Sequence, residues 1–218
     1  MKIPVIINNR DLLTWPKAMV ERISRYDNVG DIVIIDNAST NKELIQWYKT
    51  GPCNQVIASI ENKGHTAPWD LNVVKFYNQG YYVVTDSDLD LSNTPDDTLQ
   101  YLLEKEKELK LGKVGLGLEW WRVKPESPYY NHMQNYEVPR WNNTTVKNGV
   151  FTNIAIDTTF ALYSVPYYFI GGGSTGVPYT ARHLPWEFTV EEREKDAEFM
   201  YYIKNASNSS SYKTFLRL

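Results

Sequence analysis

The chain has 218 residues, 42% of them hydrophobic and 22% charged, a composition typical of one globular domain and not of a disordered chain. With 23 Lys and Arg against 26 Asp and Glu, the net charge of −3 gives no basic footprint for nucleic acid or an anionic membrane. No apolar run approaches the roughly 20 residues that a membrane span requires. The single cysteine, Cys53, excludes a disulfide framework and fits a reducing compartment, so we expect a cytoplasmic protein.

The first half of the chain alternates apolar runs with helical patterns. Apolar runs predict strands over residues 3–7, 31–35, 55–60 and 81–84, and periodicity with capping signals predicts helices over residues 11–26, 41–48, 67–79 and 94–109. In the last of these helices, Thr94 is the expected cap and Pro95 the first helical residue. This alternation predicts a parallel sheet with helices on both faces, whose ligands bind beyond the carboxyl ends of the strands.

The pattern changes after residue 112. Residues 113–121 and 154–163 are strand-like, residues 122–150 are aromatic and irregular, residues 171–182 form a glycine-led flexible loop, and residues 191–205 form a charged helix. No internal repeat and no second core are evident. We therefore expect the second half to complete the same domain.

Three carboxylates follow the fourth predicted strand. Asp86, Asp88 and Asp90 are spaced by two, so in an extended segment they point to one side, where they repel one another unless a cation lies among them or one of them is protonated. Carboxylate oxygens suit Mg²⁺ or Mn²⁺. An EF-hand loop is rejected because Leu91 stands where the sharp turn requires glycine. A phosphatase of the haloacid dehalogenase type is disfavoured because its acidic motif follows the first strand. A metal site for the diphosphate of a nucleotide sugar fits this position.

The order of these segments resembles the family 2-like glycosyltransferases of GT-A fold. The matching segments are Ile3–Asn9, Ile34–Ser39, Glu61–Gly64 and Val83–Asp90. The later segments Ala155–Tyr163 and Tyr179–Trp186 are similar to a subgroup of capsule-polysaccharide synthesis and to the glycosyltransferase domain of chlorella viruses. The resemblance covers nearly the whole chain. It implies a single α/β domain with a mostly parallel central sheet flanked by helices.

The resemblance also implies a division of labour along the chain. Residues 1–112 would bind the nucleotide sugar, residues 113–206 the acceptor, and residues 207–218 would be a tail. The implied donor-binding residues are Asn9, Arg10, Asp36, Asn62, Lys63, Gly64, His65, Asp86, Ser87 and Arg182. Asp88 would ligate Mn²⁺ or Mg²⁺, with Asp86 and His183 beside it. Asp90 would instead cap the next segment.

One motif of the family is missing. The stretch Ala67–Asn72 lacks the arginine that the family places near the donor, so UDP and dTDP both remain open as the nucleotide, with UDP favoured. Lys63 or His65 would then supply the positive charge.

The implied reaction is inverting transfer, in which a carboxylate removes a proton from the acceptor hydroxyl. Asp157 and Glu187 are the two candidates for this base, with Asp157 favoured. The candidates for stacking on acceptor sugars are Trp120, Trp121, Trp141, Tyr179 and Trp186. The alternatives are a sugar nucleotidyltransferase, although Asn8–Asp11 lacks a glycine-rich phosphate loop, and a non-catalytic carbohydrate-binding domain.

Overall fold

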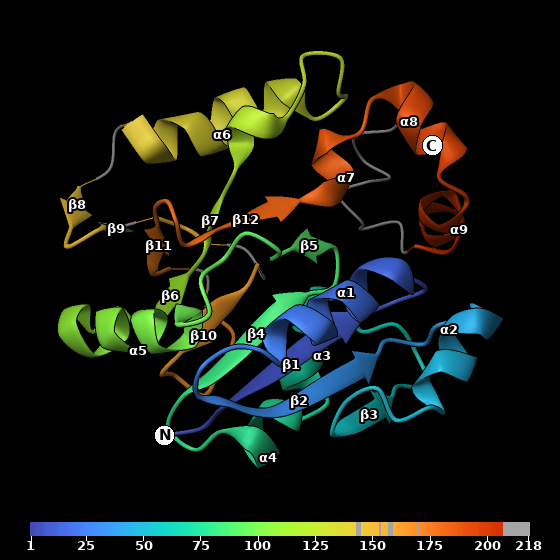
Figure 1. Cartoon of the computed structure of the whole chain (residues 1–218), viewed down its shortest axis with the longest axis horizontal. Coiled ribbons are helices and arrows are strands. Elements are labelled where there is room, and N and C mark those ends of the chain that lie inside the picture. The colour runs from blue at the N-terminus through green and yellow to red at the C-terminus, as the bar shows by residue number, and fades with distance from the viewer. Residues whose placement is uncertain (143–144, 153, 157–158, 170, 207–218) are drawn as a thin grey trace.

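The computed structural model describes residues 1–142, 145–152, 154–156, 159–169 and 171–206 (Figure 1). Its first half consists of β1 (Ile3–Asn9), α1 (Thr14–Ile23), β2 (Val29–Asp36), α2 (Lys42–Tyr48), β3 (Gln55–Ala58), the 3-10 helix η1 (Gly64–Thr66), α3 (Ala67–Asp70), α4 (Val73–Tyr77), β4 (Tyr82–Asp86), β5 (Leu89–Asp90) and α5 (Thr98–Leu109). Its second half consists of β6 (Lys113–Gly115), β7 (Gly117–Leu118), η2 (Trp120–Arg122), α6 (Tyr130–Asn142), β8 (Val146–Lys147), β9 (Val150–Thr152), β10 (Ala161–Tyr163), β11 (Gly173–Thr175), β12 (Thr180–His183), α7 (Leu184–Glu187), α8 (Val190–Lys195) and α9 (Ala197–Asn205).

Two sheets organise the described part of the chain. The larger has nine strands in the order β3-β2-β1-β4-β10-β6-β11-β9-β8. The strands β1 to β4 run parallel to one another, whereas β10 pairs antiparallel with both β4 and β6. The smaller sheet has the order β5-β12-β7, so a late strand lies between two earlier ones. The sheet is thus parallel in the first half and mixed in the second.

The parallel half is buried on both faces. Val5 and Ile7 of β1 belong to one apolar cluster with Met19 of α1, while Ile6 belongs to another with Val73 of α4. Because successive side chains of a strand point to opposite faces, this alternation places helices on both sides of the sheet. The prediction of a two-faced α/β sheet is confirmed.

The helices of the first half match their predicted ranges, with two corrections. The predicted helix over residues 67–79 divides into α3 and α4, because Asn72 adopts a left-handed conformation with φ of 57°. The prediction that Thr94 caps α5 is wrong. Its hydroxyl instead donates to the carbonyl of Leu91 at 2.6 Å, and the helix begins only at Thr98.

Several expectations for the second half are also wrong. The segment expected to be irregular contains α6, and of the described residues in the expected strand over 154–163, only Ala161–Tyr163 form a strand. The expected flexible loop over residues 171–182 contains β11 and leads into β12, both hydrogen-bonded within sheets. The expected helix over residues 191–205 is broken at Asp196, which caps α9 by accepting from the amide of Phe199 at 2.9 Å.

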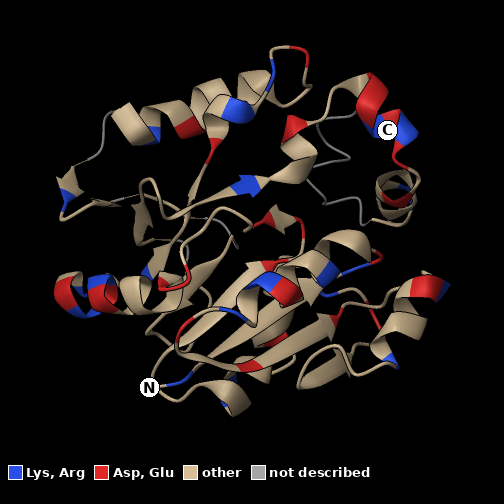
Figure 2. Ribbon diagram, in the orientation of Figure 1, with Lys and Arg blue, Asp and Glu red and all other residues tan. Residues whose placement is uncertain are grey.

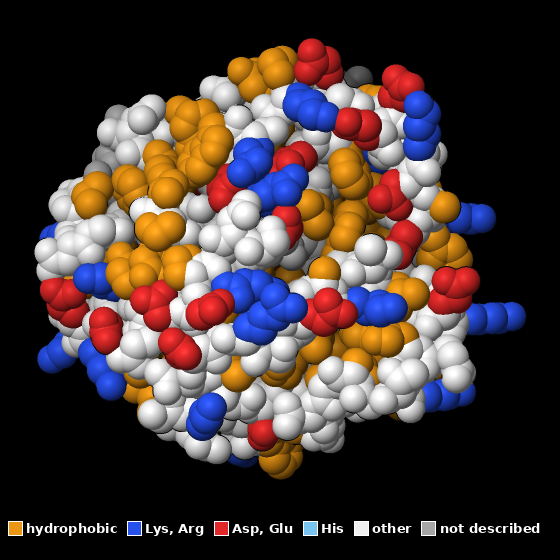
Figure 3. All heavy atoms as spheres, viewed as in Figure 1, with side chains coloured by type: hydrophobic (Ala, Val, Ile, Leu, Met, Phe, Trp, Pro, Cys, Tyr) orange, Lys and Arg blue, Asp and Glu red, His pale blue; other side chains and the backbone are white. Residues whose placement is uncertain are grey.

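The surface carries charges of both signs. Figure 3 shows Lys and Arg side chains interspersed with Asp and Glu, and hydrophobic side chains gathered over the region of α6 and its neighbouring strands. None of the helices in the described residues has the length and apolar character needed to cross a membrane.

Candidate functional site

The carboxyl ends of three parallel strands, β1, β2 and β4, lie side by side along one side of the larger sheet, which we call its carboxyl edge. Asn9 of β1 lies opposite Asp36 of β2, and Asn8 of β1 lies opposite Asp86 of β4. The predicted strand-end residues are therefore neighbours in space. This edge is where ligands of open α/β sheets bind.

Asp36 is a buried carboxylate at this edge, with 8% of its surface exposed. It accepts a hydrogen bond from the amide of Ser39 at 3.1 Å. Burial raises the pKa of Asp36 above its ordinary value of 3.8, because desolvation disfavours the charged form, although its hydrogen bonds with Ser39 act in the opposite direction. A partly desolvated acceptor of this kind suits an N–H or O–H donor of a ligand.

Asn9 and Arg10 lie beside Asp36 but contact the protein itself. The amide of Asn9 donates to the carbonyl of Leu12 and to the hydroxyl of Tyr48, both at 2.8 Å. The guanidinium of Arg10 donates to the carbonyls of Asn37 at 3.0 Å and Asn205 at 2.9 Å. These contacts shape the edge of the sheet and join its loops to the end of α9.

The loop from Asn62 to His65 is held close to the same edge. The carbonyl of Gly64 accepts from Asn8 at 3.0 Å and from Asn37 at 2.9 Å, and the amide of Gly64 donates to Asn62 at 2.8 Å. Gly64 has φ of +69°, a conformation that favours glycine. Sequence reasoning missed the role of Asn37, although its place after a predicted strand was a usable signal.

The two cationic candidates of this loop face other partners. Lys63 forms an ion pair with Glu61, and its backbone amide donates to Asn37 at 2.8 Å. His65 is exposed and contacts the ring of Tyr168, with the centroids 5.4 Å apart.

The acidic motif forms a tight turn between β4 and β5. Asp86 is the half-buried last residue of β4, while Ser87 and Asp88 in the turn are buried, with 4% and 6% exposed. Asp90 faces a different partner, since its carboxylate accepts from Arg182 at 2.8 Å and from the amide of Ser92 at 2.8 Å. The expectation of an extended segment, on which the alignment of the three carboxylates depended, is wrong, because residues 87 and 88 form a turn between β4 and β5.

The pairing of β5 with β12 brings a distant histidine to this turn. His183 lies opposite Leu89, and the amide of Leu184 donates to the carbonyl of Asp88 at 3.2 Å. As a result, Nε2 of His183 is 3.9 Å from Oδ1 of Asp88, and both side chains are largely buried. The imidazole stacks on Trp186, with centroids 4.0 Å apart and planes within 6°.

Arg182 fastens the same strand pair. Its guanidinium donates to both carboxylate oxygens of Glu187, at 2.9 and 2.6 Å, and also to Asp90. These hydrogen bonds to Glu187 are the main cause that raises the pKa of Arg182. Figure 2 shows the basic segment of β12 beside the acidic β5. The structure therefore gives both Arg182 and Glu187 internal partners, while Asp157, the other candidate base, lies outside the described residues.

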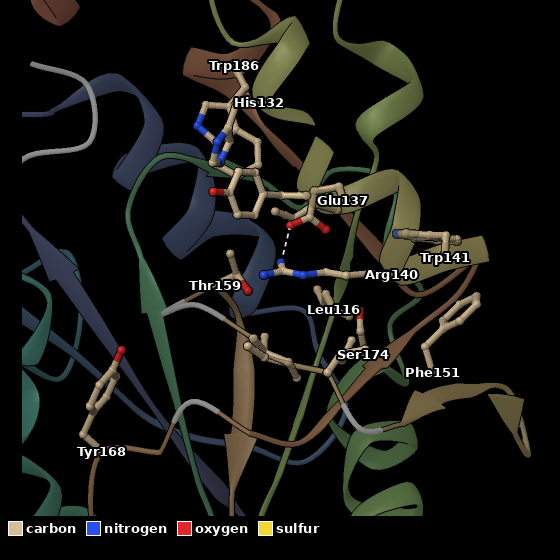
Figure 4. Close-up of a pocket in the computed structure, with 15 residues that line it drawn as sticks. Leu116, His132, Glu137, Arg140, Trp141, Phe151, Thr159, Tyr168, Ser174 and Trp186 are labelled. Carbon is tan, nitrogen blue, oxygen red and sulfur yellow. Dashed lines mark hydrogen bonds and ion pairs between the residues drawn. The ribbon is translucent and has the colours of Figure 1, made fainter. Parts of the chain in front are cut away.

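A cavity of about 350 Å³ opens on the second half of the chain, between α6 and the neighbouring strands (Figure 4). Trp141 and Trp186, two of the predicted stacking residues, line this cavity. Tyr179 stacks instead on Tyr101, with centroids 3.7 Å apart. Sequence reasoning missed Glu137 and Arg140 of α6, which form an ion pair in the cavity wall.

A metal ion would find two donor side chains at the turn. Across the described ranges of the chain, no group of three or more His, Cys, Asp and Glu side chains is placed to hold a metal ion. Asp88 and His183 nevertheless place a carboxylate oxygen and an imidazole nitrogen 3.9 Å apart. Carboxylate with imidazole suits Mn²⁺ better than Mg²⁺, which takes oxygen ligands. The pair fits a metal site whose other ligands come from a bound substrate.

Comparison with known proteins identifies the fold. No protein-family model matches the sequence, and no curated protein sequence matches it. Among solved structures, the mannosyltransferase PcManGT from Pyrobaculum calidifontis, in complex with GDP-Man and Mn²⁺, has a TM-score of 0.52 at 13% identity, over 99% of this chain and 68% of that chain. Glucosyl-3-phosphoglycerate synthase from Mycobacterium tuberculosis, with Mn²⁺, UDP and glucosyl-3-phosphoglycerate, has a TM-score of 0.48 at 14% identity, over 75% of this chain and 57% of that chain. TarS from S. aureus has a TM-score of 0.41 at 18% identity, over 55% of this chain and 22% of that chain.

This chain spans less than a quarter of the length of TarS and about two thirds of that of PcManGT. The likeness to PcManGT extends over nearly all of this chain. Together with the observed sheet, it establishes a single α/β domain of GT-A type, as the sequence predicted.

Proposed function

We propose that this chain is a metal-dependent glycosyltransferase that moves a sugar, with inversion, from a UDP- or dTDP-sugar to a glycan or polysaccharide acceptor. The observation that carries the proposal is the contact between Asp88 and His183 at the carboxyl edge of a GT-A sheet. Two segments nearly a hundred residues apart converge there on a carboxylate–imidazole pair. The structure of PcManGT, which has the same fold, holds GDP-Man and Mn²⁺.

In this proposal the strand-end edge binds the nucleotide. Asp36 accepts from the base or the ribose, and the backbone of the Asn62–Gly64 loop approaches the nucleoside. Asp88 and His183, with Asp86 beside them, hold Mn²⁺ or Mg²⁺, which when bound offsets the charge that develops on the leaving diphosphate. UDP is favoured over dTDP as the nucleotide. Residues 1–112 thus form the donor half and residues 113–206 the acceptor half.

Inversion requires in-line attack by an acceptor hydroxyl whose proton passes to a carboxylate. We assign that role to Asp157, because Glu187 is held by two hydrogen bonds from Arg182. The likeness to capsule-polysaccharide and chlorella virus enzymes, and the cytoplasmic location expected from the lone Cys53, remain predictions.

Calorimetry of UDP binding, with and without Mn²⁺, tests the proposal. The wild type should bind UDP much more tightly with Mn²⁺, and Asp88→Asn should abolish this metal dependence, because the amide removes the charge while keeping the shape. Asp27→Asn is the matched control, since Asp27 is exposed and precedes β2 at the opposite end of the sheet.

Two results would contradict the assignment. Retention of Mn²⁺-dependent UDP binding by Asp88→Asn would remove Asp88 from the metal site. Metal-independent UDP binding by the wild type would favour a non-catalytic module. If neither result is found, screening the hydrolysis of a panel of nucleotide sugars would identify the donor.

A further inference from the structure

The cavity beside α6 has walls suited to a ligand with both apolar and hydroxyl-bearing surfaces. Figure 4 shows Trp141 and Phe151 on one side, and His132 and Trp186 on another. Thr159 and Ser174 add hydroxyls among the apolar lining. Its volume of about 350 Å³ lies at the lower end of the range typical of small-molecule sites, about 300–1,000 Å³. Pyranose rings combine apolar C–H faces with polar edges and therefore match such walls.

The charged groups of the cavity wall neutralise each other. Glu137 is 8% exposed, and its Oε1 accepts from Arg140 at 2.5 Å. In Figure 4 the Arg140 side chain extends across the cavity toward Thr159, with its guanidinium joined to Glu137. An anionic ligand would have to compete with Glu137 for this guanidinium and lose water beside a buried carboxylate. A neutral hydroxyl group carries no charge to desolvate, so it can enter the cavity without that cost.

The cavity also adjoins the proposed metal site. Trp186 lines the cavity and stacks on His183, whose Nε2 is 3.9 Å from Asp88. The stacked rings of Trp186 and His183 therefore link the wall of the cavity to the proposed metal site. A neighbouring position of this kind suits the second substrate of a transfer reaction.

We propose that this cavity binds the uncharged sugar residue of the acceptor, and that the Glu137–Arg140 pair selects it against acidic sugars. The proposal rests on the proposed function for the identity of the ligand as acceptor. The binding preference itself is measured without donor, metal or turnover.

NMR titration of the full chain with methyl glycosides tests the preference. The neutral probes are the methyl glycosides of glucose, galactose, mannose and xylose, and the acidic probes are those of glucuronic and galacturonic acid. At least one neutral glycoside should shift the resonances of residues 130–142, and it should bind at least tenfold more tightly than either acidic probe. Equal or tighter binding of an acidic probe would overturn the proposal, as would the absence of shifts with every neutral probe.

Glu137→Gln tests the source of the selectivity. The variant frees the guanidinium of Arg140 for a ligand carboxylate, so affinity for the acidic probes should rise by about tenfold or more. Unchanged discrimination in a folded Glu137→Gln protein would overturn the role of the pair.

Tyr136→Ala provides a second variant that leaves the charges in place. Tyr136 lines the cavity and is 56% exposed, so its truncation spares the core. Affinity for the neutral glycoside should fall by about 2- to 10-fold, as expected for the loss of one aromatic contact. Phe76→Ala is the matched control, because Phe76 is 81% exposed on α4 and does not line the cavity. Equal affinities of Tyr136→Ala and the wild type would count against the cavity.

The two proposals can fail separately. Loss of the glycoside preference with intact Mn²⁺-dependent UDP binding refutes only the acceptor site. Glycoside binding without any UDP binding refutes the transferase.

Discussion

Asp36, which the proposed function places against the nucleoside, is a carboxylate whose burial changes its protonation. Its pKa is raised by desolvation, so the folded protein holds this proton more tightly than the unfolded chain. The stabilising effect of that proton is complete below the ordinary value of 3.8 and is lost as the pH rises through the raised pKa. A donor N–H from a nucleoside, by contrast, needs the carboxylate in its charged form.

We therefore expect uridine binding to weaken as the pH falls toward the raised pKa of Asp36. Uridine carries no phosphate, so its binding isolates this contact from the metal site. In Asp36→Asn the binding should be roughly fivefold weaker at neutral pH, since hydrogen bonds to charged groups exceed neutral ones by about 1 kcal/mol, and it should lose the acid-side dependence. NMR titration between mildly acidic and neutral pH measures both effects. An unchanged pH profile in Asp36→Asn would assign the effect to another group.

Replacing Glu187 or Asp157 by the corresponding amide should affect different properties, stability for Glu187 and turnover for Asp157. Glu187→Gln breaks the paired hydrogen bonds to Arg182, whose side chain is 27% exposed, so we expect the free energy of unfolding to fall by about 1 kcal/mol. Its turnover should stay within about tenfold of the wild type, whereas Asp157→Asn should lower turnover by about 10²–10⁴ with donor affinity unchanged. Urea unfolding and steady-state transfer assays measure these quantities.

The opposite pattern would reverse the assignment. A turnover loss confined to Glu187→Gln, with stability unchanged, would make Glu187 the base.

Among the elements of the fold, strand β12 is held in place by backbone pairing with two other strands. It is paired with β5 on one side and β7 on the other, and the amide of Glu119 donates to the carbonyl of Ala181 at 3.0 Å. Central strands of a sheet open less readily than exposed edges. A mobile lid over residues 180–183 is therefore not expected.

Hydrogen exchange should show slow amides over residues 180–183 before any nucleotide is added. Addition of UDP and Mn²⁺ should change their rates by less than the change at the Asn62–Gly64 loop. The exposed edge strand β8 serves as a fast-exchanging reference in the same experiment. Rapid exchange of β12 that slows only with nucleotide would contradict this expectation and indicate a segment that closes on nucleotide binding.

Local sequence patterns predicted the first half well because its strands are continuous apolar runs. The stretch Asp31–Ile35 is such a run, and its two neighbours in the sheet, β1 and β3, are the strands directly before and after it in the chain. Alpha-helix α6 was missed because Pro139 and many polar and aromatic residues obscure its periodicity. Short strands such as β11 depend on pairing with distant partners, which no local pattern reveals.

The candidate site divides in the same way. The strand-end acids Asp36, Asp86 and Asp88 were found from local order, whereas the partners of Asp90 and Arg182 were not, because these partners lie far along the chain. The position of His183 was expected from family resemblance, and the β5–β12 pairing supplies its physical basis.

For the whole molecule, the joint binding of UDP and Mn²⁺ should stabilise the folded state. At a concentration of 100 times the dissociation constant, ligation adds about 2.7 kcal/mol, which raises the Tm of a domain of this size by roughly 5–11 °C. We expect this rise with UDP and Mn²⁺ together, and a much smaller one with UDP and a chelator. Differential scanning fluorimetry measures both. Equal rises of the Tm under the two conditions would show that nucleotide binding does not depend on the metal.

The ion pair between Arg182 and Asp90 joins residues 92 positions apart, and this separation bears on biosynthesis. A ribosome that adds about 5–20 residues per second needs roughly 5–18 s to pass from one to the other. During that interval strands β1 to β4 can pair with one another, whereas β5 and the acidic turn before it lack the pairing with β12. The strands β1 to β4 thus emerge well before the strand that brings His183 to Asp88, so a premature stop before residue 180 would release a domain whose acidic turn has lost its partner strand.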